Sequence, residues 1–283
     1  MRGVECRAFL RQMLPVFGLR WAGYRKVHRT LCKRLARRLR ELGISDLEAY
    51  RHRLESDPEE RARFEAICRI PISRVFRDRE VFDLLAREVL PELAKTARDE
   101  SRPVRVWSCG CASGEEPYSL AILWHAGLEP SFPEVDLDLV ATDADQVLLE
   151  RACAGCYKPS SLREVPATMR ELAFVRRNGL FCVRKHLRGR VAFLQQDVRH
   201  EAPPDRFDLI LCRNLVFTYF ERAVQSKVLA TITGRLRPNG FLVIGQGERL
   251  PDTAPGFVTL RTGLPVYRLT PRGASASGVC QAR

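Results

Sequence analysis

The stretch RVWSCGCASGEEPYSLAILW, residues 105–124, most constrains the fold that this chain can adopt. It begins with the apolar pattern of a buried strand, ends with that of a helix, and joins the two by a glycine-rich turn. Such turns are typical of α/β proteins that bind nucleotides. A dinucleotide site would read G-x-G-x-x-G and hold a pyrophosphate at the helix start, but this turn runs into Glu115 and Glu116. Two carboxylates at that point would repel a pyrophosphate.

The rest of the chain beyond residue 104 alternates short apolar runs with helical stretches. This alternation predicts an α/β fold with a parallel, doubly wound sheet. The predicted strands are 104–108, 137–142, 191–196, 207–212, 241–245 and 265–269. Asn239-Gly240 predicts a turn before the fifth of them. The less regular stretch 155–190 is a candidate for a small inserted subdomain, and residues 271–283 are expected to be a flexible tail.

Residues 1–77 are expected to form a small, basic, all-helical domain, ahead of a sheet domain over 78–270. Leucines at three- and four-residue steps predict a helix over 24–42 that Gly43 ends. Ser45 is expected to cap a second helix, and Asp57-Pro58 to begin a third. An amphipathic helix over 78–98 is expected to connect this domain to the sheet.

The positive charge is concentrated at the beginning of the chain. The net charge is +13. Residues 1–77 hold 19 Lys and Arg against 9 Asp and Glu, and the segment 20–40 has nine basic residues and no acidic one. This predicts an anionic partner, namely nucleic acid, a membrane face or an acidic protein surface. A merely solvated helix face is the alternative.

The cysteines and the hydropathy pattern point to a cytoplasmic protein. No apolar run is long enough for a membrane span, and no export signal is visible, so membrane insertion is not expected. The ten cysteines are therefore expected to be reduced thiols. Cys153 and Cys156 have the spacing of a metal knuckle, but no second pair accompanies them, so no metal site is predicted.

Polar residues follow two further predicted strands, where a doubly wound sheet binds its ligand. Asp143 follows the second strand and could accept hydrogen bonds from ribose hydroxyls; alternatively, it caps the next helix. Gln196 and Asp197 follow the third strand, where an adenine edge would lie. With the two glutamates, which could also merely favour the helix dipole, this set favours a phosphate-free, cationic ligand. S-adenosylmethionine, with S-adenosylhomocysteine as its product, is such a ligand.

Five segments together resemble the CheR family of chemotaxis receptor methyltransferases, over roughly residues 17–270. They are ISRVFRDREVF, WSCGCASGEEPYSLAILW, ATDADQVLLERACAGCYKPSSLREVP, FDLILCRNLVFTYF and LRPNGFLVIGQGERL. The basic helix at the beginning of the chain resembles the family's helical N-terminal domain. The resemblance implies a Rossmann-like class I S-adenosylmethionine-dependent fold with a small β-subdomain over 155–190. It also implies O-methylation of protein glutamate side chains, with an acidic, helical chemoreceptor domain docking on the basic helix.

The resemblance also implies roles for particular residues. Arg77 and Tyr219 would be catalytic, and Arg213 and Asn214 would border the methionine part of the cofactor and the substrate. The other cofactor-binding residues implied are Ser73, Gly110, Ala112, Gly114, Glu115, Glu116, Asp143, Gln196 and Asp197, together with Arg77.

The sequence departs from the family pattern in places. Pro71, Ser73 and Val75 replace an asparagine, a threonine and a phenylalanine, and the gap between Asn214 and the tyrosine is one residue longer, which makes Thr218 an alternative to Tyr219. Three other functions stay open. A nucleic-acid methyltransferase would fit the charge, but Asn214-Leu-Val-Phe lacks the prolines of base-methylating enzymes, so nucleic acid is not the expected partner. A non-catalytic S-adenosylmethionine-binding scaffold is the second, and a small-molecule O-methyltransferase is the third. A monomer is the default expectation.

Overall fold

The computed structural model describes residues 3–251, 254 and 256–270, so the predicted tail over 271–283 lies outside the described residues. The chain divides into two compact units. The helical unit consists of Met1–Ile72 with Asn214–Gln225, and the sheet unit of Ser73–Arg213 with Ser226–Arg283. No helix in the described ranges has the length and apolar character needed to cross a membrane.

The helical unit is built from short amphipathic helices, as the sequence predicted. They are α1 (Gly3–Val16), α2 (Trp21–Tyr24), α3 (His28–Glu41), α4 (Leu47–Ser56), α5 (Pro58–Cys68) and α12 (Val216–Tyr219). The helix expected over 24–42 is interrupted by a turn between α2 and α3. Gly43 follows α3 with φ +65°, a conformation that glycine adopts without strain.

Two helix starts of this unit test the capping predictions. Asp46, and not Ser45, caps α4, because its carboxylate accepts hydrogen bonds from the N–H groups of Glu48 and Ala49. The prediction for Ser45 was wrong by one residue, since serine and aspartate serve equally well as caps. Asp57 caps α5, with Pro58 in its first turn, as predicted.

A buried carboxylate holds three helices of this unit together. Glu60 is only 2% exposed and accepts hydrogen bonds from the guanidinium of Arg38 and the hydroxyl of Tyr50. Arg34 donates to the main-chain carbonyls of Ile67 and Arg69. Some arginines of the basic segment therefore stabilise the fold instead of facing a partner.

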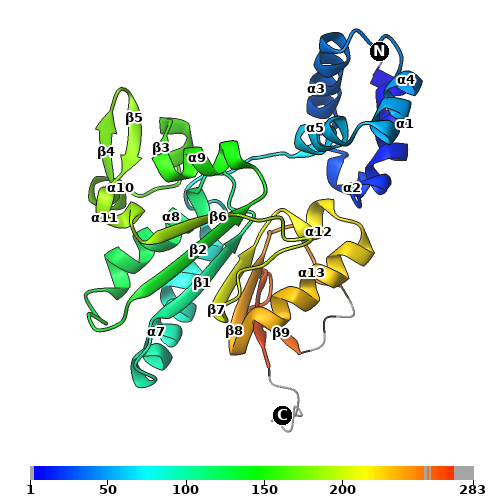
Figure 1. The fold of residues 1–283 in the computed structure, drawn as a ribbon. Coiled ribbons are helices and arrows are strands. Elements are labelled where there is room, and N and C mark those ends of the chain that lie inside the picture. Colours follow the sequence, from blue (N-terminus) through cyan, green and yellow to red (C-terminus); the bar gives the residue numbers. More distant parts are fainter. Residues whose placement is uncertain (1–2, 252–253, 255, 271–283) are drawn as a thin grey trace. The chain divides into compact units, whose positions relative to one another are not determined.

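The sheet unit confirms the predicted fold class, a mostly parallel sheet flanked by helices (Figure 1). Its seven strands lie in the order β6-β2-β1-β7-β8-β10-β9, and β10 runs antiparallel to both its neighbours. The strands are β1 (Val104–Cys109), β2 (Leu137–Asp143), β6 (Val191–Gln195), β7 (Phe207–Cys212), β8 (Leu236–Ile244), β9 (Phe257–Thr259) and β10 (Val266–Leu269). The chain moves outward from β1 to β2 and β6 and then returns to β7 on the other side of β1, so the ligand-binding switch point lies at β1.

The helices of this unit surround a core that includes the fully buried Trp107 and Trp124. They are α6 (Arg79–Leu84), α7 (Leu90–Asp99), α8 (Glu115–Leu123), α9 (Gln146–Ala154), α10 (Ala167–Ala173), α11 (Lys185–Arg188) and α13 (Arg222–Arg235), which begins in the helical unit. π-Helical segments at Leu85–Val89 and Trp124–Leu128 and a 3₁₀ turn at Pro159–Leu162 complete the set. The turn predicted at Asn239-Gly240 instead falls inside β8, as a register irregularity against β7 with Asn239 at φ +62°.

The stretch 155–190 contains a three-stranded antiparallel sheet, the small β-subdomain. Its order is β3 (Cys156–Tyr157), β5 (Leu180–Val183) and β4 (Phe174–Arg177). Disulfide bonds join Cys156 to Cys182 in this sheet and Cys6 to Cys32 in the helical unit. The expectation of reduced thiols is therefore wrong for these four cysteines. Each pair is 26 residues apart and meets only through strand pairing or helix packing, which the sequence does not display.

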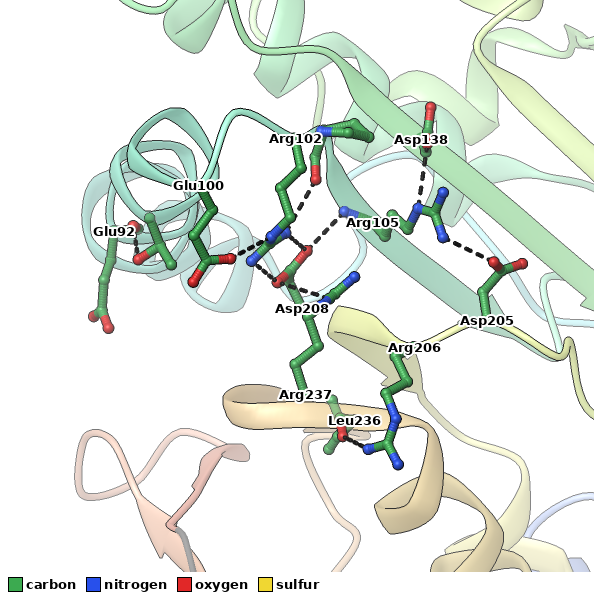
Figure 2. Close-up of polar contacts among 12 residues, drawn as sticks. Glu92, Glu100, Arg102, Arg105, Asp138, Asp205, Arg206, Asp208, Leu236 and Arg237 are labelled. Carbon is green, nitrogen blue, oxygen red and sulfur yellow. Dashed lines mark hydrogen bonds and ion pairs between the residues drawn. The ribbon is translucent and has the colours of Figure 1, made fainter.

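A second buried carboxylate holds the sheet unit together. Asp208 on β7 is 3% exposed and accepts two hydrogen bonds from the Arg102 guanidinium, at 2.8 and 2.9 Å, and one from the Arg105 main-chain N–H at 2.9 Å. Arg237 approaches the same carboxylate at 3.7 Å (Figure 2). The cluster links the chain before β1 to β7 and β8.

Candidate active site

The glycine turn after β1 has a conformation that its small residues explain. Gly110, Ala112 and Gly114 all have positive φ, at 75°, 49° and 87°. A Cβ atom on Gly114 would lie 2.9 Å from the Cβ of Ala152 and 3.2 Å from the hydroxyl of Tyr157. The N–H groups of Gly110 and Cys111 donate to the carbonyl of Thr142, at 2.8 and 3.0 Å. The turn is therefore tied to the end of β2 and has no room for a side chain at Gly114.

Asp143, the last residue of β2, supports this turn directly. Its Oδ2 accepts a hydrogen bond from the N–H of Ala112 at 2.9 Å, and its Oδ1 accepts one from the N–H of Asp145 at 2.9 Å. The N-cap of α9 is Asp145, which accepts from Val147 and Leu148. The alternative that Asp143 caps the helix is therefore wrong. Its carboxylate lies at the carboxyl edge of the sheet, beside the turn.

The two glutamates of the turn have different surroundings. Glu116 accepts hydrogen bonds from the hydroxyl of Ser108, at 2.7 Å, and from Arg213, at 3.2 Å. Glu115 is 5% exposed, and its Oε2 has no hydrogen-bond partner among the described residues. Burial raises the pKa of the Glu115 carboxyl, against the opposing effect of its own main-chain N–H and of a hydrogen bond from Ser73. Glu116 is thus satisfied within the fold, whereas Glu115 keeps an open acceptor.

Arg213, which follows β7, holds the segment around Arg77 against the turn. Its guanidinium donates to Glu116, to the carbonyl of Arg77 at 2.8 Å and to the carboxylate of Asp78 at 2.7 Å. Its side chain is only 3% exposed and lies over the ring of Phe82. The structure therefore gives Arg213 a positioning role that its place after a strand did not reveal.

The backbone around Arg77 adopts an unusual conformation. Phe76 and Asp78 have φ values of 56° and 61°, which are rare for residues with side chains and persist only where the surroundings enforce them. The N–H of Phe76 donates to the hydroxyl of Ser119 on α8, at 2.9 Å, and that hydroxyl donates to the carbonyl of Glu115 at 2.6 Å. Arg77 is thus fixed between two constrained residues.

Gln196 and Asp197, which follow β6, differ in their hydrogen-bond partners. The N–H of Gln196 donates to the carbonyl of Asp143, at 3.1 Å, and its side-chain Oε1 is buried without a hydrogen-bond partner in the described chain. Asp197 instead accepts hydrogen bonds from the main chain and guanidinium of Arg199. Burial opposes ionisation of Asp197, but the bonds from Arg199 prevail and lower its pKa. Gln196 thus lies beside Asp143, while Asp197 is engaged with its own loop.

Two of the candidate residues belong to the helical unit. Tyr219 ends α12, with its ring 4.9 Å from that of Tyr24, and the main-chain carbonyl of Thr218 accepts a hydrogen bond from the Arg20 guanidinium. Asn214 has φ +56°, a conformation that asparagine tolerates. The sheet unit by itself brings together Ser73, Arg77, the turn, both glutamates, Asp143, Gln196 and Arg213.

Sequence reasoning missed three contributors. Ser108 and Asp78 fix Glu116 and Arg213, and no pattern marks either of them. Tyr157, which follows the candidate metal knuckle, donates a hydrogen bond to the carbonyl of Ser113 in the turn, at 2.7 Å. Its place in the segment ATDADQVLLERACAGCYKPSSLREVP, which resembles the family, was the available signal.

Comparison with known proteins identifies the family. The family described as CheR methyltransferase, SAM binding domain, matches residues 72–262, and the CheR methyltransferase all-alpha domain matches residues 26–65. The chain belongs to the CheR methyltransferase family. The predicted resemblance and the class of cofactor are thereby confirmed, and the chain is an S-adenosylmethionine-dependent methyltransferase.

Individual relatives agree with this assignment. A probable chemotaxis protein methyltransferase of Rhizobium etli is 34% identical over 85% of this chain and 91% of its own length. A chemotaxis protein methyltransferase of Klebsiella aerogenes is 36% identical over 84% of this chain and 80% of its own. An uncharacterized 104.1 kDa protein of Rhodobacter capsulatus is 30% identical over 87% of this chain, which spans 26% of that longer protein.

The site fits the cofactor of this family. A phosphate-free ligand with an ammonium group suits the unpartnered carboxylate oxygen of Glu115, which follows the turn. The open amide oxygen of Gln196 lies after β6, beside Asp143. Both oxygens are buried, and buried polar atoms normally have a partner. Because Gly114 has no Cβ, the turn can pack closely against Ala152.

Neutralising Glu115 is expected to stabilise the fold while weakening ligand binding. Because burial raises its folded pKa, ionisation of Glu115 at neutral pH opposes folding. The Glu115→Gln variant should therefore have a higher free energy of unfolding than the wild type at pH 7. The difference should vanish below pH ~4, where glutamate is itself neutral. Affinity for S-adenosylhomocysteine should fall about 10-fold or more, the value of a charged hydrogen bond.

The adjacent Glu116→Gln variant is the matched control. It removes the negative charge that faces the buried Arg213 guanidinium, and it should lower the free energy of unfolding by about 1–3 kcal/mol. Chemical denaturation at pH 7 and pH 4 measures both variants. A loss of stability in Glu115→Gln at pH 7 would contradict this assignment.

Proposed function

We propose that this chain methylates glutamate side chains of an acidic, helical signalling protein, a chemoreceptor domain in the first instance. The unpartnered carboxylate oxygen of Glu115, beside the glycine turn, supports the cofactor part of this proposal. Membership of the CheR methyltransferase family and the names of the relatives supply the chemotaxis context.

In this proposal Glu115 accepts the ammonium of the cofactor and Asp143 the ribose hydroxyls. Gly110, Ala112 and Gly114 shape the turn, and Gln196 meets the adenine. Ser73 and Asn214 border the methionine part. Asp197 contributes through its loop, because its carboxylate is engaged with Arg199. Arg213 and Glu116 are proposed to position these residues through their contact with each other, without binding the cofactor themselves.

The chemistry asks little of the protein beyond placement. The bound cofactor supplies an electrophilic methyl group. A substrate glutamate, with a reference pKa of about 4.3, is already ionised at neutral pH, so no general base is required. Arg77 is proposed to position the substrate carboxylate through one oxygen, because gripping both would lower its nucleophilicity. Tyr219 is proposed to shape the path of the methyl group.

A paired peptide substrate tests the reaction. An acidic helical peptide with one central glutamate should accept a labelled methyl group. The same peptide with glutamine at that position should not, because an amide is not a comparable nucleophile. Equal labelling of both peptides would overturn the assignment of glutamate as the acceptor.

The exposed basic face of the helical unit is proposed to dock this substrate. Arg34 and Arg38 are engaged in structural contacts, but Arg29, Lys33 and Arg40 are exposed and outside every ion pair among the described residues. Their spacing of four and seven residues places them on one face of α3. A positive face of this kind steers an acidic partner.

Charge reversal on this face should weaken substrate use without affecting the cofactor. The variant Arg29→Glu/Lys33→Glu/Arg40→Glu is expected to raise KM for an acidic protein about 10-fold at low salt, with an unchanged Kd for S-adenosylhomocysteine. Added salt should likewise raise KM in the wild type far more than Kd. The matched control reverses three exposed lysines of equal charge elsewhere, at Lys95, Lys185 and Lys227. Equal losses in the two triple variants would contradict docking on α3.

A further inference from the structure

The disulfide of the small β-subdomain lies next to a residue that supports the cofactor turn. Cys156 and Cys182 are directly opposed on antiparallel strands and covalently joined. The next residue, Tyr157, donates its hydroxyl hydrogen to the carbonyl of Ser113 at 2.7 Å. A Cβ on the neighbouring Gly114 would lie 3.2 Å from this hydroxyl. Tyr157 thus connects the disulfide-bonded Cys156 to the turn.

The strand that carries Tyr157 has little pairing of its own. β3 comprises two residues, which pair with two residues of β5. One further main-chain hydrogen bond joins Val183 to the carbonyl of Gly155, at 2.9 Å. So short a pairing relies on the covalent bond to hold its register. Opening the disulfide should therefore loosen Tyr157.

The two sulfurs differ in access. Cys182 is buried at 4% exposure, whereas Cys156 is partly exposed, so an incoming thiolate meets Cys156 first. Cys153, three residues before it, is the exposed free cysteine of the described chain. It is a thiol that any modifying reagent will also find, and it serves as an internal control.

We propose that Cys156 and Cys182 form a reversible thiol-modification site, opened by a dithiol and closed by a peroxide, that sets the affinity of the cofactor turn through Tyr157. In the opening step a thiolate of the dithiol attacks Sγ of Cys156, and Cys182 leaves as a thiolate and takes up a proton. The second thiol of the reductant then displaces Cys156 and becomes part of a cyclic disulfide. Two electrons and two protons pass to the protein.

The closing step reverses this balance. The Cys156 thiolate attacks peroxide and becomes a sulfenic acid with release of hydroxide. The Cys182 thiolate then displaces hydroxide from that sulfur, and the disulfide forms again. Overall, one peroxide is reduced to two waters for two thiols oxidised.

Calorimetric titration with S-adenosylhomocysteine in two redox states tests the proposal. The protein is treated with dithiothreitol or with hydrogen peroxide, and mass spectrometry after alkylation counts the thiols and maps the disulfides. We expect Kd to rise by about 10-fold when Cys156–Cys182 opens, a coupling of ordinary size between neighbouring sites. Amide exchange of the ligand-free protein should increase at Ser113–Gly114 in the same state.

Three variants isolate the route. Cys182→Ser should bind as the reduced protein does under both treatments. Cys32→Ser, which removes the other disulfide, and Cys153→Ser should both keep the full redox response. Tyr157→Phe keeps the disulfide but loses the bond to Ser113, so its Kd should be raised already and should no longer respond. An unchanged Kd with the disulfide verifiably opened, or thiols that peroxide does not join, would overturn the proposal.

Discussion

Replacing Asp143 with alanine is expected to weaken binding of S-adenosylhomocysteine by about 10- to 100-fold, the value of losing one or two charged hydrogen bonds. The carboxylate lies at the carboxyl end of β2 and accepts a hydrogen bond from the N–H of Ala112 at 2.9 Å. Its removal takes away the proposed ribose acceptor and leaves the N–H of Ala112, in the turn, without this acceptor. Calorimetric titration measures the loss.

The variant Asp145→Ala is the matched control. Asp145 caps α9: its carboxylate accepts hydrogen bonds from the N–H groups of Val147 and Leu148, and its own main-chain N–H donates to Asp143. Its loss should cost about 1 kcal/mol of stability and leave Kd within about twofold. Equal affinity of Asp143→Ala and the wild type would remove Asp143 from the cofactor site.

The largest loss of stability is expected on substitution of Asp208, a buried carboxylate that has no proposed role in methyl transfer. The Asp208→Ala variant should unfold with a free energy lower by about 3 kcal/mol or more, because it leaves the largely buried Arg102 guanidinium with the exposed Glu100 as its remaining ionic partner. For a unit of this size, that corresponds to a fall in Tm of roughly 10 °C. Figure 2 shows Arg102, Arg105 and Arg237 meeting at this one carboxylate.

The Asp205→Ala variant is the comparison for Asp208. Asp205 also pairs with an arginine, Arg105, at 2.8 Å, but its side chain is 46% exposed. An exposed pair is worth about 1 kcal/mol or less. Thermal unfolding of both variants measures the difference, and comparable losses of Tm would show that burial does not decide the stabilising effect here.

The sequence predicted what depends on local patterns. The strand runs, the parallel sheet and the placement of Asp143 beside the glycine turn follow from alternation and from the rule that parallel strands end at one edge. The starts of α4 and α5 were predicted to within one residue, whereas the helix expected from residue 24 is divided into α2 and α3. Ser45 and Asp46 are both good caps, as are Asp143 and Asp145, and only the backbone geometry chooses between them.

The sequence could not predict what depends on contacts between distant segments. Arg213 joins Arg77, Asp78 and Glu116 only because β7 lies beside β1, which no spacing reveals. Glu115 and Glu116 are adjacent and chemically alike, yet a helix turns them about 100° apart, so that one is buried with an unpartnered Oε2 atom and the other is paired at both oxygens. The disulfide of Cys156 likewise depends on the pairing of β3 with β5.

The alkali lability of the transferred methyl group tests the central claim most directly. The chain is incubated with methyl-labelled S-adenosylmethionine and an acidic chemoreceptor domain, and the labelled protein is exposed to mild alkali. A methyl ester of a glutamate carboxylate hydrolyses and releases volatile labelled methanol, which is the result that this account predicts. Label that stays on the protein would mean methylation of nitrogen or another stable position, and would contradict glutamate O-methylation.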